Sequence, residues 1–546
     1  MFDEELAKSI GCTLTRAREL RAYFESEWST GQPPAPHISL PKVPITPGEL
    51  AAFTAFYRRA TQTYAFILPG EPVRLCVDEI KAGTLDPVVL TGLKHLIVDE
   101  YQDLNRADIE LIDLLAAMGV VVFALGDDDQ SIYSFRHAYP EGIQDFLLRH
   151  KSAGSHVLQH CFRCSEKILA AATSVLASFP PPKRIPKVQE SVYKASTPPV
   201  PGQALGWAFQ NVTAEAKAVA ASVKALLTQG TAPEDILVLI SSRDAQAGPL
   251  LTALVEAGVK AEVQSSSGYA DEDGTRFVYA LLRTMSDSED YVALRTLLGI
   301  RAGVGMKICS DITDACHTHH LNFADQFTPT RTASAFSTRQ LKALDGVVAV
   351  RASVAGWTLA DTLGARKAEI EALVSAHLPA PALKEWRSFT DALPDAFTLE
   401  EVRDVLGARG PKHVREVLRD AFARIGSELP PEYDPAGRVR IMTLHSSKGL
   451  SAKAVFLPGL EDEILPGPYR AKYSGQVSEA ARLLYVGITR ARALCVLSYS
   501  KKRPMNGSTK VHGPSRFVPS LGIPFAASSG LGPAELQAYS AHVADL

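Results

Sequence analysis

The stretch HLIVDEYQDLN at residues 95–105 decides the fold, because an apolar strand runs directly into an acidic turn. Residues 108–118 (DIELIDLLAAM) follow with the apolar spacing of an amphipathic helix, which Gly119 ends. The next apolar run, VVVFAL at 120–125, predicts a second strand. A strand, a helix and a strand in this order predict a parallel sheet with helices on its faces.

A second series of strands lies further along the chain. Short apolar runs occur at residues 236–240 (ILVLI), 439–444 (VRIMTL) and 454–457 (AVFL). Between the first and second of these runs, residues 286–428 are rich in Ala and Leu and predict helices rather than strands. The sequence therefore predicts an α/β fold in which an all-α subdomain is inserted into the second sheet domain.

Three proline-rich stretches separate these segments, at residues 33–47, 180–202 and 429–437. Proline fixes φ and cannot donate to a central sheet ladder. We therefore expect each stretch to be a loop or a linker.

The composition is that of an ordinary globular protein, with 46% hydrophobic and 21% charged residues among 546 and a formal net charge of -3. This balance gives no global sign of nucleic-acid binding, although a basic groove can lie on a neutral molecule. Seven scattered cysteines indicate a reducing compartment rather than a disulfide framework. No apolar run approaches the roughly 20 residues that span a bilayer. The acidic N-terminus is unlike a signal peptide, so we predict a cytoplasmic protein without membrane contact.

Two carboxylates end the first predicted strand. Asp99 and Glu100 would lie at the carboxyl edge of the parallel sheet, where ligands of open α/β folds bind. Asp99 can hold Mg²⁺, directly or through water, and Glu100 can orient and deprotonate an attacking water. A single Asp-Glu pair after a strand is more often a solvated turn, so this motif needs support from its neighbours.

A second motif, GDDDQSIYSFRHA at 126–138, follows the next predicted strand. The amide of Gln130 can contact a γ-phosphate and a water. Tyr133 and Phe135 beside Arg136 combine two aromatic faces with a cation, which suits stacking of single-stranded bases and pairing with phosphate. Core packing is the alternative role for these aromatic residues, and the neighbouring acidic motif favours binding.

The two motifs resemble motifs II and III of the UvrD/Rep-type superfamily 1 DNA helicases. The resemblance continues in order through LQHCFRCSEKIL at 158–169 (motif IV), residues 439–466 (motif V and its continuation) and ARLLYVGITRAR at 481–492 (motif VI). Residues 235–263 also resemble the second motor domain of the family. The match covers about residues 93–499.

The resemblance implies two RecA-like parallel-sheet domains of the P-loop NTPase type, the first incomplete, with an inserted all-α subdomain. Residues 1–92 would be a helical N-terminal piece with a proline-rich linker, the remnant of an accessory subdomain. The other parts would be the partial first motor domain (93–157), the first part of the second motor domain (158–285), the inserted subdomain (286–428), the second part of the second motor domain (429–525) and a C-terminal tail (526–546).

The resemblance also implies a role for each motif residue. Arg163 and Arg490 would reach the γ-phosphate from the second domain and would act in catalysis together with Asp99, Glu100 and Gln130. ATP and Mg²⁺ would be the cofactors, with the metal at Asp99. The implied nucleotide contacts are Phe162, Lys448, Gly449 and Ser451, and the implied DNA contacts are Tyr133, Phe135, Arg136, Thr443 and His445.

The sequence departs from the family at the phosphate-binding loop (Walker A). That loop, G-x-x-x-x-G-K-[ST], cradles the β- and γ-phosphates with backbone N–H groups and a lysine. The dipeptide Gly-Lys occurs nowhere in the 546 residues. Ser451 also replaces the glutamate that usually contacts the ribose, and His137 replaces a usual glycine.

Two groups of potential metal ligands are present. Cys161 and Cys164 form a CxxC motif without a second pair nearby, which argues against zinc. The stretch rich in Cys and His at 309–320 has no standard ligand spacing. We expect neither group to bind a metal.

Three functional hypotheses result. The first is an ATP-dependent 3′-5′ DNA helicase or translocase of DNA repair or recombination, which acts on single-stranded and 3′-tailed duplex DNA. Its P-loop would lie in a separate polypeptide or in an upstream reading frame, or would have been lost from the gene. The second is a non-catalytic homologue that binds single-stranded DNA or a partner, and the third is a truncated gene product. The helicase is favoured, because a protein independent of ATP has no need for all five residues implied in catalysis. The isolated chain is expected to lack ATPase activity.

Overall fold

The computed structural model describes residues 2–31, 44–64, 66–192, 202–264, 269–391, 393–429, 437–505 and 508–544. The chain falls into two compact units. The first contains residues 1–25, 40–69 and 265–434, and the second contains residues 26–39, 70–264 and 435–546. None of the described helices is both long enough and apolar enough to cross a membrane.

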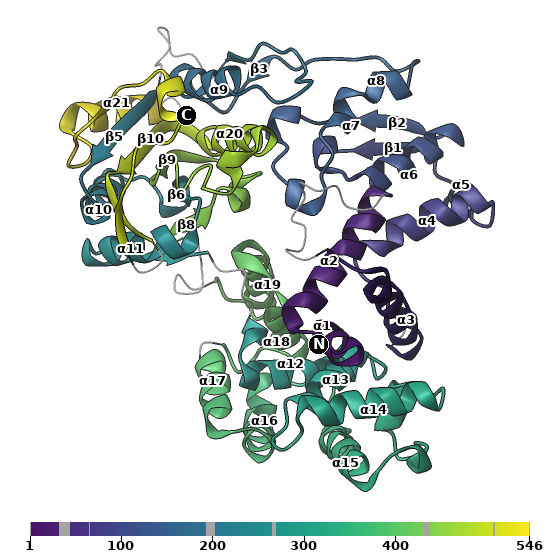
Figure 1. Cartoon of the computed structure of the whole chain (residues 1–546). Coiled ribbons are helices and arrows are strands. Elements are labelled where there is room, and N and C mark those ends of the chain that lie inside the picture. Colours follow the sequence, from purple (N-terminus) through teal and green to yellow (C-terminus); the bar gives the residue numbers. More distant parts are fainter. Residues whose placement is uncertain are drawn as a thin grey trace. The chain divides into compact units, whose positions relative to one another are not determined.

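A seven-stranded sheet forms the centre of the second unit (Figure 1). All of its neighbouring strands are parallel, which confirms the predicted fold class. The strands predicted at 236–240, 439–444 and 454–457 are all present in it. In spatial order the strands are β13 (Phe525–Ala526), β5 (Gln203–Phe209), β10 (Ala491–Ser500), β9 (Ala452–Leu457), β6 (Ile236–Ile240), β8 (Val439–Thr443) and β7 (Ala261–Val263).

Helices cover both faces of this sheet. In β6, Leu237 and Leu239 belong to one hydrophobic core, whereas Val238 and Ile240 belong to the core on the other face. A strand that is buried on both faces needs an unbroken apolar run, which explains why ILVLI shows no polar alternation. The first core contains α9 (Glu166–Ser178) and α20 (Ser474–Ile488), and the second contains α10 (Val212–Thr228), α11 (Arg243–Glu256) and α21 (Pro533–Val543).

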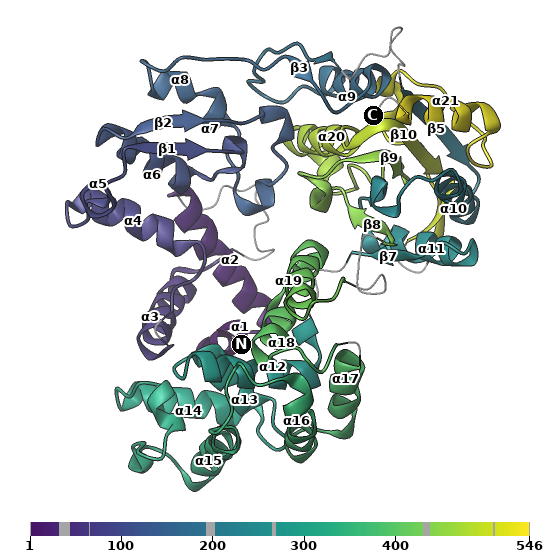
Figure 2. The same cartoon turned by 180° about the vertical axis from the view of Figure 1, so that it is seen from behind.

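A second, smaller sheet contains two strands in the described part of the chain. β1 (His95–Val98) and β2 (Val121–Ala124) are parallel, and α6 (Arg106–Ala117) connects them along one face (Figure 2). This is the predicted β-α-β unit. Asn105 begins the helix with a capping box, in which its side chain and that of Asp108 each accept a hydrogen bond from the backbone N–H of the other.

The opposite face of this small sheet is open to solvent. Ile97, Val121 and Phe123 are 73%, 59% and 58% exposed, whereas Leu96 and Val122 pack toward α6. Parallel sheets are normally covered on both faces. In the described part of the chain, this small sheet therefore has an apolar face that no helix covers.

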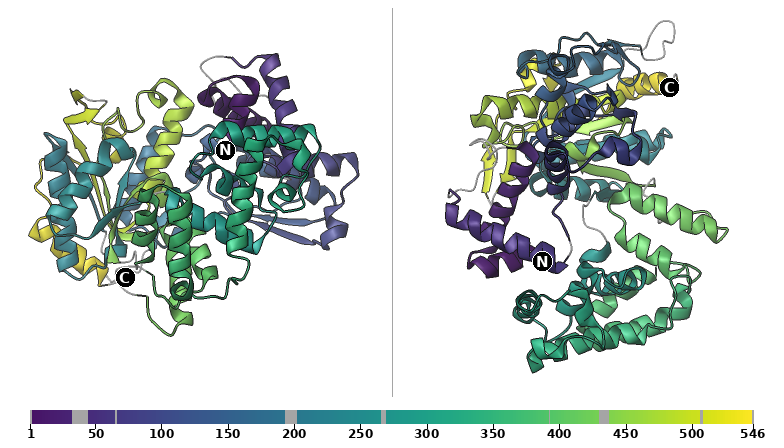
Figure 3. Two further views of the ribbon diagram at one scale, coloured as in Figure 1. Left: turned by 90° about the horizontal axis from the view of Figure 1, so that it is seen from below. Right: turned by 90° about the vertical axis from the view of Figure 1, so that its right-hand side faces the viewer.

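The first unit is built from helices, drawn in dark purple, teal and green in Figure 3. Glu5, on α1 (Phe2–Ile10), is buried and forms an ion pair of 3.0 Å with Arg295; it also accepts a hydrogen bond of 2.9 Å from Tyr64 at the end of α3 (Pro47–Tyr64). These contacts attach the N-terminal helices to the predicted insertion. Residues 265–434 of this unit contain α12 (Asp273–Ser286), which precedes the predicted insertion, and then α13 (Tyr291–Gly299), α14 (Met306–Thr318), α15 (Thr338–Ser353), α16 (Leu363–His377), α17 (Ala380–Thr390), α18 (Leu399–Gly407) and α19 (Gly410–Arg424) within it.

The predicted linkers and the predicted C-terminal tail differ in how far the structure describes them and in what they form. Most of the proline-rich stretches at 33–47 and 429–437 lies outside the described residues. The stretch at 180–202 is described as far as residue 192 and contains the short strand β4 (Glu190–Ser191), which pairs with β3 (His160–Cys161). Residues 526–546, expected as a tail, include α21, whose Tyr539 is 1% exposed in a core of the large sheet.

A buried charge network joins α10 to the large sheet. Arg503, in β11 (Lys502–Met505), is 1% exposed and pairs with Glu215 of α10 and with Glu461, which follows β9. Glu215 also accepts hydrogen bonds from the Ser498 hydroxyl at 2.7 Å and from the Gly459 N–H at 3.0 Å. One guanidinium therefore balances two buried carboxylates.

Replacing Arg503 by Met is expected to lower the free energy of unfolding by about 3–5 kcal/mol, because two carboxylates would remain buried without their cation. Urea denaturation followed by circular dichroism measures this loss. Arg516→Met is the matched control, because the Arg516 side chain is 35% exposed against Asp462. The control should cost at most about 1 kcal/mol. Equal losses in the two variants would contradict the role given to Arg503.

Candidate active site

The acidic turn lies at the carboxyl end of β1. Asp99 is exposed, and its carboxylate accepts a hydrogen bond of 2.8 Å from the Glu100 N–H. Glu100 has a left-handed backbone with φ 52°, which residues other than glycine adopt rarely. Exposed carboxylate oxygens are ligands that Mg²⁺ prefers, so the surroundings of Asp99 fit the predicted metal role.

Gln102 joins the acidic turn to the second motif, a role that the sequence did not reveal. Its side chain is fully buried, and its Nε2 donates to the Glu100 carboxylate at 2.5 Å. Its Oε1 accepts from the Asp127 N–H at 2.9 Å. A Cβ atom on Gly126 would lie only 2.5 Å from this oxygen, which explains the glycine at that position. The only sequence signal was the place of Gln102 two residues after Glu100.

The second motif follows β2 and is held by ion pairs. Gln130 donates from Nε2 to the Asp127 carboxylate at 2.8 Å. The neighbouring carboxylates at 127–129 lie within 4.8 Å of one another, and Lys187 pairs with all three. Arg184 adds a bidentate pair to Asp129 at 2.7 Å. These cations compensate the acidic cluster, so it serves to anchor the proline-rich stretch beside the motif.

Lys448 connects the loop after β8 to both motifs. Its side chain is 7% exposed, and its ammonium pairs with Asp103 and lies 3.3 Å from the Glu100 carboxylate. It also donates to the Gln130 carbonyl at 3.0 Å and lies 5.2 Å from the ring centroid of Tyr133. Burial raises the pKa of Asp103, although the Lys448 ammonium opposes this shift. The ammonium of Lys448 therefore contacts four residues of the two motifs, namely Glu100, Asp103, Gln130 and Tyr133.

The predicted DNA contacts gather around His445. The Tyr133 hydroxyl lies 3.5 Å from the His445 carbonyl, and the Phe135 ring meets the imidazole edge-on with 5.5 Å between centroids. The Arg136 guanidinium lies 5.9 Å from the Tyr133 ring centroid. Burial lowers the pKa of His445, so its imidazole is neutral at pH 7. The structure thus brings together three rings and a cation, with Phe135 and Arg136 exposed.

A further contact positions this aromatic cluster. Glu479 of α20 accepts hydrogen bonds from the Ser134 N–H at 3.3 Å and from the Ser134 hydroxyl at 2.5 Å. Ser134 lies between the two aromatic residues of the motif, and no role was predicted for it. The contact attaches the motif to the helix that precedes Arg490.

Other predicted residues of the β8 loop lie around Lys448. The Thr443 hydroxyl is 2.8 Å from that of Ser446, at the end of β8. Gly449 has φ 83°, a conformation that favours glycine, and Ser451 is exposed. Their predicted contacts with DNA and nucleotide remain predictions.

The two predicted arginine fingers differ in accessibility. Arg163 is partly exposed next to Phe162, which is 74% exposed. Arg490 is 1% exposed and donates to the carbonyls of Val486 at 2.8 Å and Leu450 at 3.1 Å. Burial, together with the charge of Arg163, lowers the pKa of Arg490 to about 10. Arg490 must leave these carbonyls before it can reach a phosphate, whereas Arg163 and Phe162 are already accessible.

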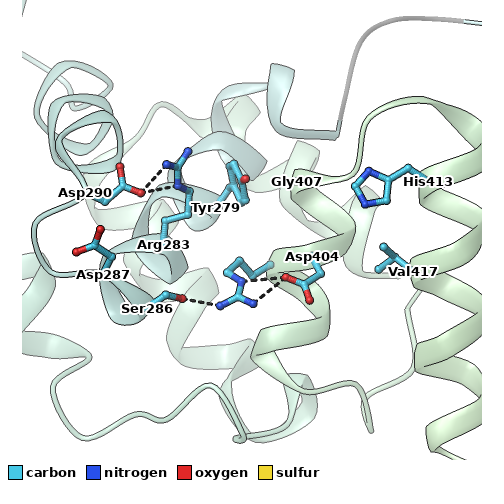
Figure 4. Close-up of a pocket in the computed structure, with 10 residues that line it drawn as sticks. Tyr279, Arg283, Ser286, Asp287, Asp290, Asp404, Gly407, His413 and Val417 are labelled. Atoms are coloured by element: carbon cyan, nitrogen blue, oxygen red, sulfur yellow. Dashed lines mark hydrogen bonds and ion pairs between the residues drawn. The ribbon is translucent and has the colours of Figure 1, made fainter. Parts of the chain in front are cut away.

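A pocket of about 430 Å³ lies in the helical unit and is drawn in Figure 4. Arg283 donates to Asp290 at 2.6 Å, and Arg403 donates to Ser286 at 2.6 Å. No residue predicted for the site lines this pocket. The candidate site therefore lies at the edge of the small sheet, where Glu100, Gln130 and Tyr133 meet Lys448.

Two family models match the chain. The model of the UvrD/REP helicase N-terminal domain matches residues 89–151, which contain the acidic turn and the aromatic motif. The model of the UvrD-like helicase C-terminal domain matches residues 397–502, which contain Lys448, His445 and Arg490.

Curated relatives agree with these models. The chain is 28% identical over 454 residues to the ATP-dependent DNA helicase UvrD1 of Mycobacterium tuberculosis, covering 78% of this chain and 57% of the relative. It is 25% identical over 458 residues to the ATP-dependent DNA helicase PcrA of Bacillus subtilis (78% and 57%) and 25% identical over 441 residues to DNA helicase II of Escherichia coli (78% and 58%). The chain thus spans less than three fifths of the length of these relatives. Its residues 89–151 and 397–502 are thus similar to the two domain types of UvrD-like helicases, and the chain is similar to curated helicases of this kind.

Proposed function

We propose that this chain forms the greater part of an ATP-dependent 3′-5′ DNA helicase or translocase of DNA repair or recombination, working in the cytoplasm. The observation that carries the proposal is the position of Lys448, which contacts the acidic turn, Gln130 and the Tyr133 ring together. This arrangement couples groups suited to ATP chemistry with groups suited to stacking bases. Its substrates would be single-stranded DNA and duplex DNA with a 3′ tail.

Each residue has a defined part in this proposal. Asp99 would hold Mg²⁺, which neutralises charge on the phosphates when bound. Glu100 would orient and deprotonate the attacking water, with its carboxylate fixed by Gln102. Arg163 would approach the transferred phosphoryl group, and Phe162 would stack on adenine. Arg490 would follow only after it exchanges its carbonyl partners for phosphate, which ties the motion of α20 to the presence of triphosphate.

The phosphate cradle would come from a polypeptide outside these 546 residues. The apolar face formed by Ile97, Val121 and Phe123 supports this proposal, because the cover that it lacks is what a P-loop strand and helix would supply. The chain by itself would then bind the γ-phosphate too weakly for turnover.

The second candidate is a non-catalytic homologue that binds single-stranded DNA or a partner. Ser451 favours it, because a hydroxyl at this exposed position cannot accept both ribose hydroxyls as a carboxylate can. The candidates differ in whether ATP hydrolysis appears once a phosphate cradle is supplied. A truncated gene product without function is the remaining alternative. It would neither associate with a P-loop segment nor bind a single-stranded oligonucleotide.

We expect the purified chain to show no DNA-stimulated ATP hydrolysis above the rate of its Glu100→Gln variant, because the phosphate cradle is absent. A coupled assay for phosphate release at saturating single-stranded DNA measures this rate. Turnover that disappears in Glu100→Gln would overturn the expectation.

Mixing the chain with a recombinant segment that carries the P-loop strand and helix of a UvrD/Rep-type helicase should produce ATPase activity. The same segment with its P-loop lysine replaced by alanine is the control. It should associate with the chain without producing ATPase activity, because the contact of the lysine with the phosphates is lost. Ile97→Asp in this chain should prevent both association and activity, because it places a charge on the face to be covered. Association without any activity would favour the non-catalytic candidate, and absence of both would refute the proposed cover.

Phe135→Ala should weaken binding of a single-stranded oligonucleotide about tenfold, because loss of one stacked base costs roughly 1–3 kcal/mol. Fluorescence anisotropy of a labelled oligonucleotide at constant salt measures the affinity. Phe162→Ala is the matched control, since it removes another exposed ring that is assigned to adenine. Phe162→Ala should bind the oligonucleotide as tightly as the original chain does. If Phe135→Ala does so too, the aromatic cluster is not a DNA-binding surface.

A further inference from the structure

Two cysteines flank the exposed pair Phe162 and Arg163. Cys161 ends β3 and is partly exposed, whereas Cys164 lies two residues before α9 and is 1% exposed. The Cys164 N–H donates to the Cys161 sulfur at 3.5 Å. The two sulfur atoms thus belong to one bend beside the core of the large sheet, with Cys161 partly exposed and Cys164 buried in that core.

The surroundings hold the buried thiol in place. The Cys164 sulfur lies within hydrogen-bond distance of the Thr489 carbonyl, at 3.4 Å. The Cys164 carbonyl accepts from the Ser191 hydroxyl at 2.7 Å, and the Ser165 N–H donates to the Arg492 carbonyl at 3.2 Å. A fixed second thiol next to an accessible first one is the arrangement of a dithiol that closes to a disulfide.

The two thiols also differ in acidity. A hydrogen bond from the Cys164 thiol lowers the pKa of Cys161 to about 5, aided by the backbone N–H groups of Cys164 and Arg163 and by the Arg163 charge. The same hydrogen bond, together with burial, raises the pKa of Cys164. At pH 7 the accessible sulfur is therefore a thiolate and the buried one a thiol. The thiolate is the nucleophilic form, so Cys161 reacts first and the protonated Cys164 reacts in a second step.

The other cysteines with resolved shifts lack this reactivity. Burial raises the pKa of Cys309, and it raises that of Cys316 to about 12; both are fully buried on α14. Burial also raises the pKa of Cys12 and Cys495. In the described part of the chain, no further cysteine or histidine joins Cys161 and Cys164 in a group with ligand geometry. Thiol chemistry thus explains the pair better than metal binding.

We propose that Cys161 and Cys164 are a redox-active dithiol that low-molecular-weight disulfides oxidise. The Cys161 thiolate would attack one sulfur of the disulfide, forming a mixed disulfide and releasing one thiolate. The Cys164 thiol would then lose its proton and attack the Cys161 sulfur, forming the internal disulfide and releasing the second thiolate. The small disulfide is thereby reduced to two thiols by two electrons from the cysteines.

The internal disulfide would constrain the turn that carries Phe162 and Arg163. Its effect on nucleotide binding rests on the proposed function, whereas the formation of the disulfide does not. The test therefore reads the sulfur chemistry directly, without ATP or DNA.

The full chain is incubated with glutathione disulfide, its free thiols are alkylated with iodoacetamide, and tryptic peptides are identified by mass spectrometry. Trypsin cuts after Arg163, between the two cysteines, so a disulfide leaves residues 152–163 joined to 164–167. We expect this joined pair, separable by dithiothreitol. Cys164→Ser should instead retain one glutathionyl group on Cys161, and Cys161→Ser should leave Cys164 unmodified. Modification confined to other cysteines, or none, would overturn the proposal.

A second measurement needs no variant. Alkylation of Cys161 should change less than about twofold between pH 7 and pH 6, whereas the rate of free glutathione should fall about tenfold, as for an ordinary thiol of pKa ~8.5. The two rates are followed in one mixture by mass spectrometry. An equal fall in both would show that Cys161 is an ordinary thiol and would overturn the proposal.

Discussion

The ammonium of Lys448 is held by two carboxylates and a carbonyl, and the geometry of the candidate site depends on it. Asp103 and Lys448 are 345 residues apart in the sequence, yet their ion pair fixes the loop after β8 against the turn after β1. A cation with a 7% exposed side chain needs such partners, because burial of an unpaired charge is costly. The same ammonium lies over the Tyr133 ring. Any ligand that competes for Glu100 or Asp103 therefore also changes the support beneath the aromatic cluster.

Charge compensation occurs beside both the seven-stranded sheet and the small β1–β2 sheet. Arg503 lies between Glu215 and Glu461 in the large sheet, and Lys187 and Arg184 neutralise the carboxylates at 127–129 beside the small one. In both places the cation comes from an irregular or peripheral segment rather than from the central strands. These segments have few apolar side chains that could pack against the sheets, so ion pairs attach them instead.

Much of the fold could be predicted, because apolar periodicity reports burial directly. The runs HLIV and ILVLI became β1 and β6 with the predicted bounds, and the Ala- and Leu-rich insertion is helical. The roles of Gln102, Ser134 and Lys187 could not be predicted, since they arise from contacts between segments whose pairing no local pattern encodes. Motif spacing indicated Arg163 and Arg490 equally. Only tertiary packing distinguishes the accessible Arg163 from Arg490, whose guanidinium is bound to backbone carbonyls.

The uncovered face of the small parallel sheet affects how prone the protein is to aggregation and degradation in the cell. Strands with free edges and an apolar face can add further strands from other copies, which is the usual start of aggregation. Newly made chains whose sheet stays uncovered would be substrates for chaperones and proteases, while those that gain a cover would persist. The amount of this protein would then follow the supply of whatever polypeptide completes the sheet, through selective turnover of the unassembled form.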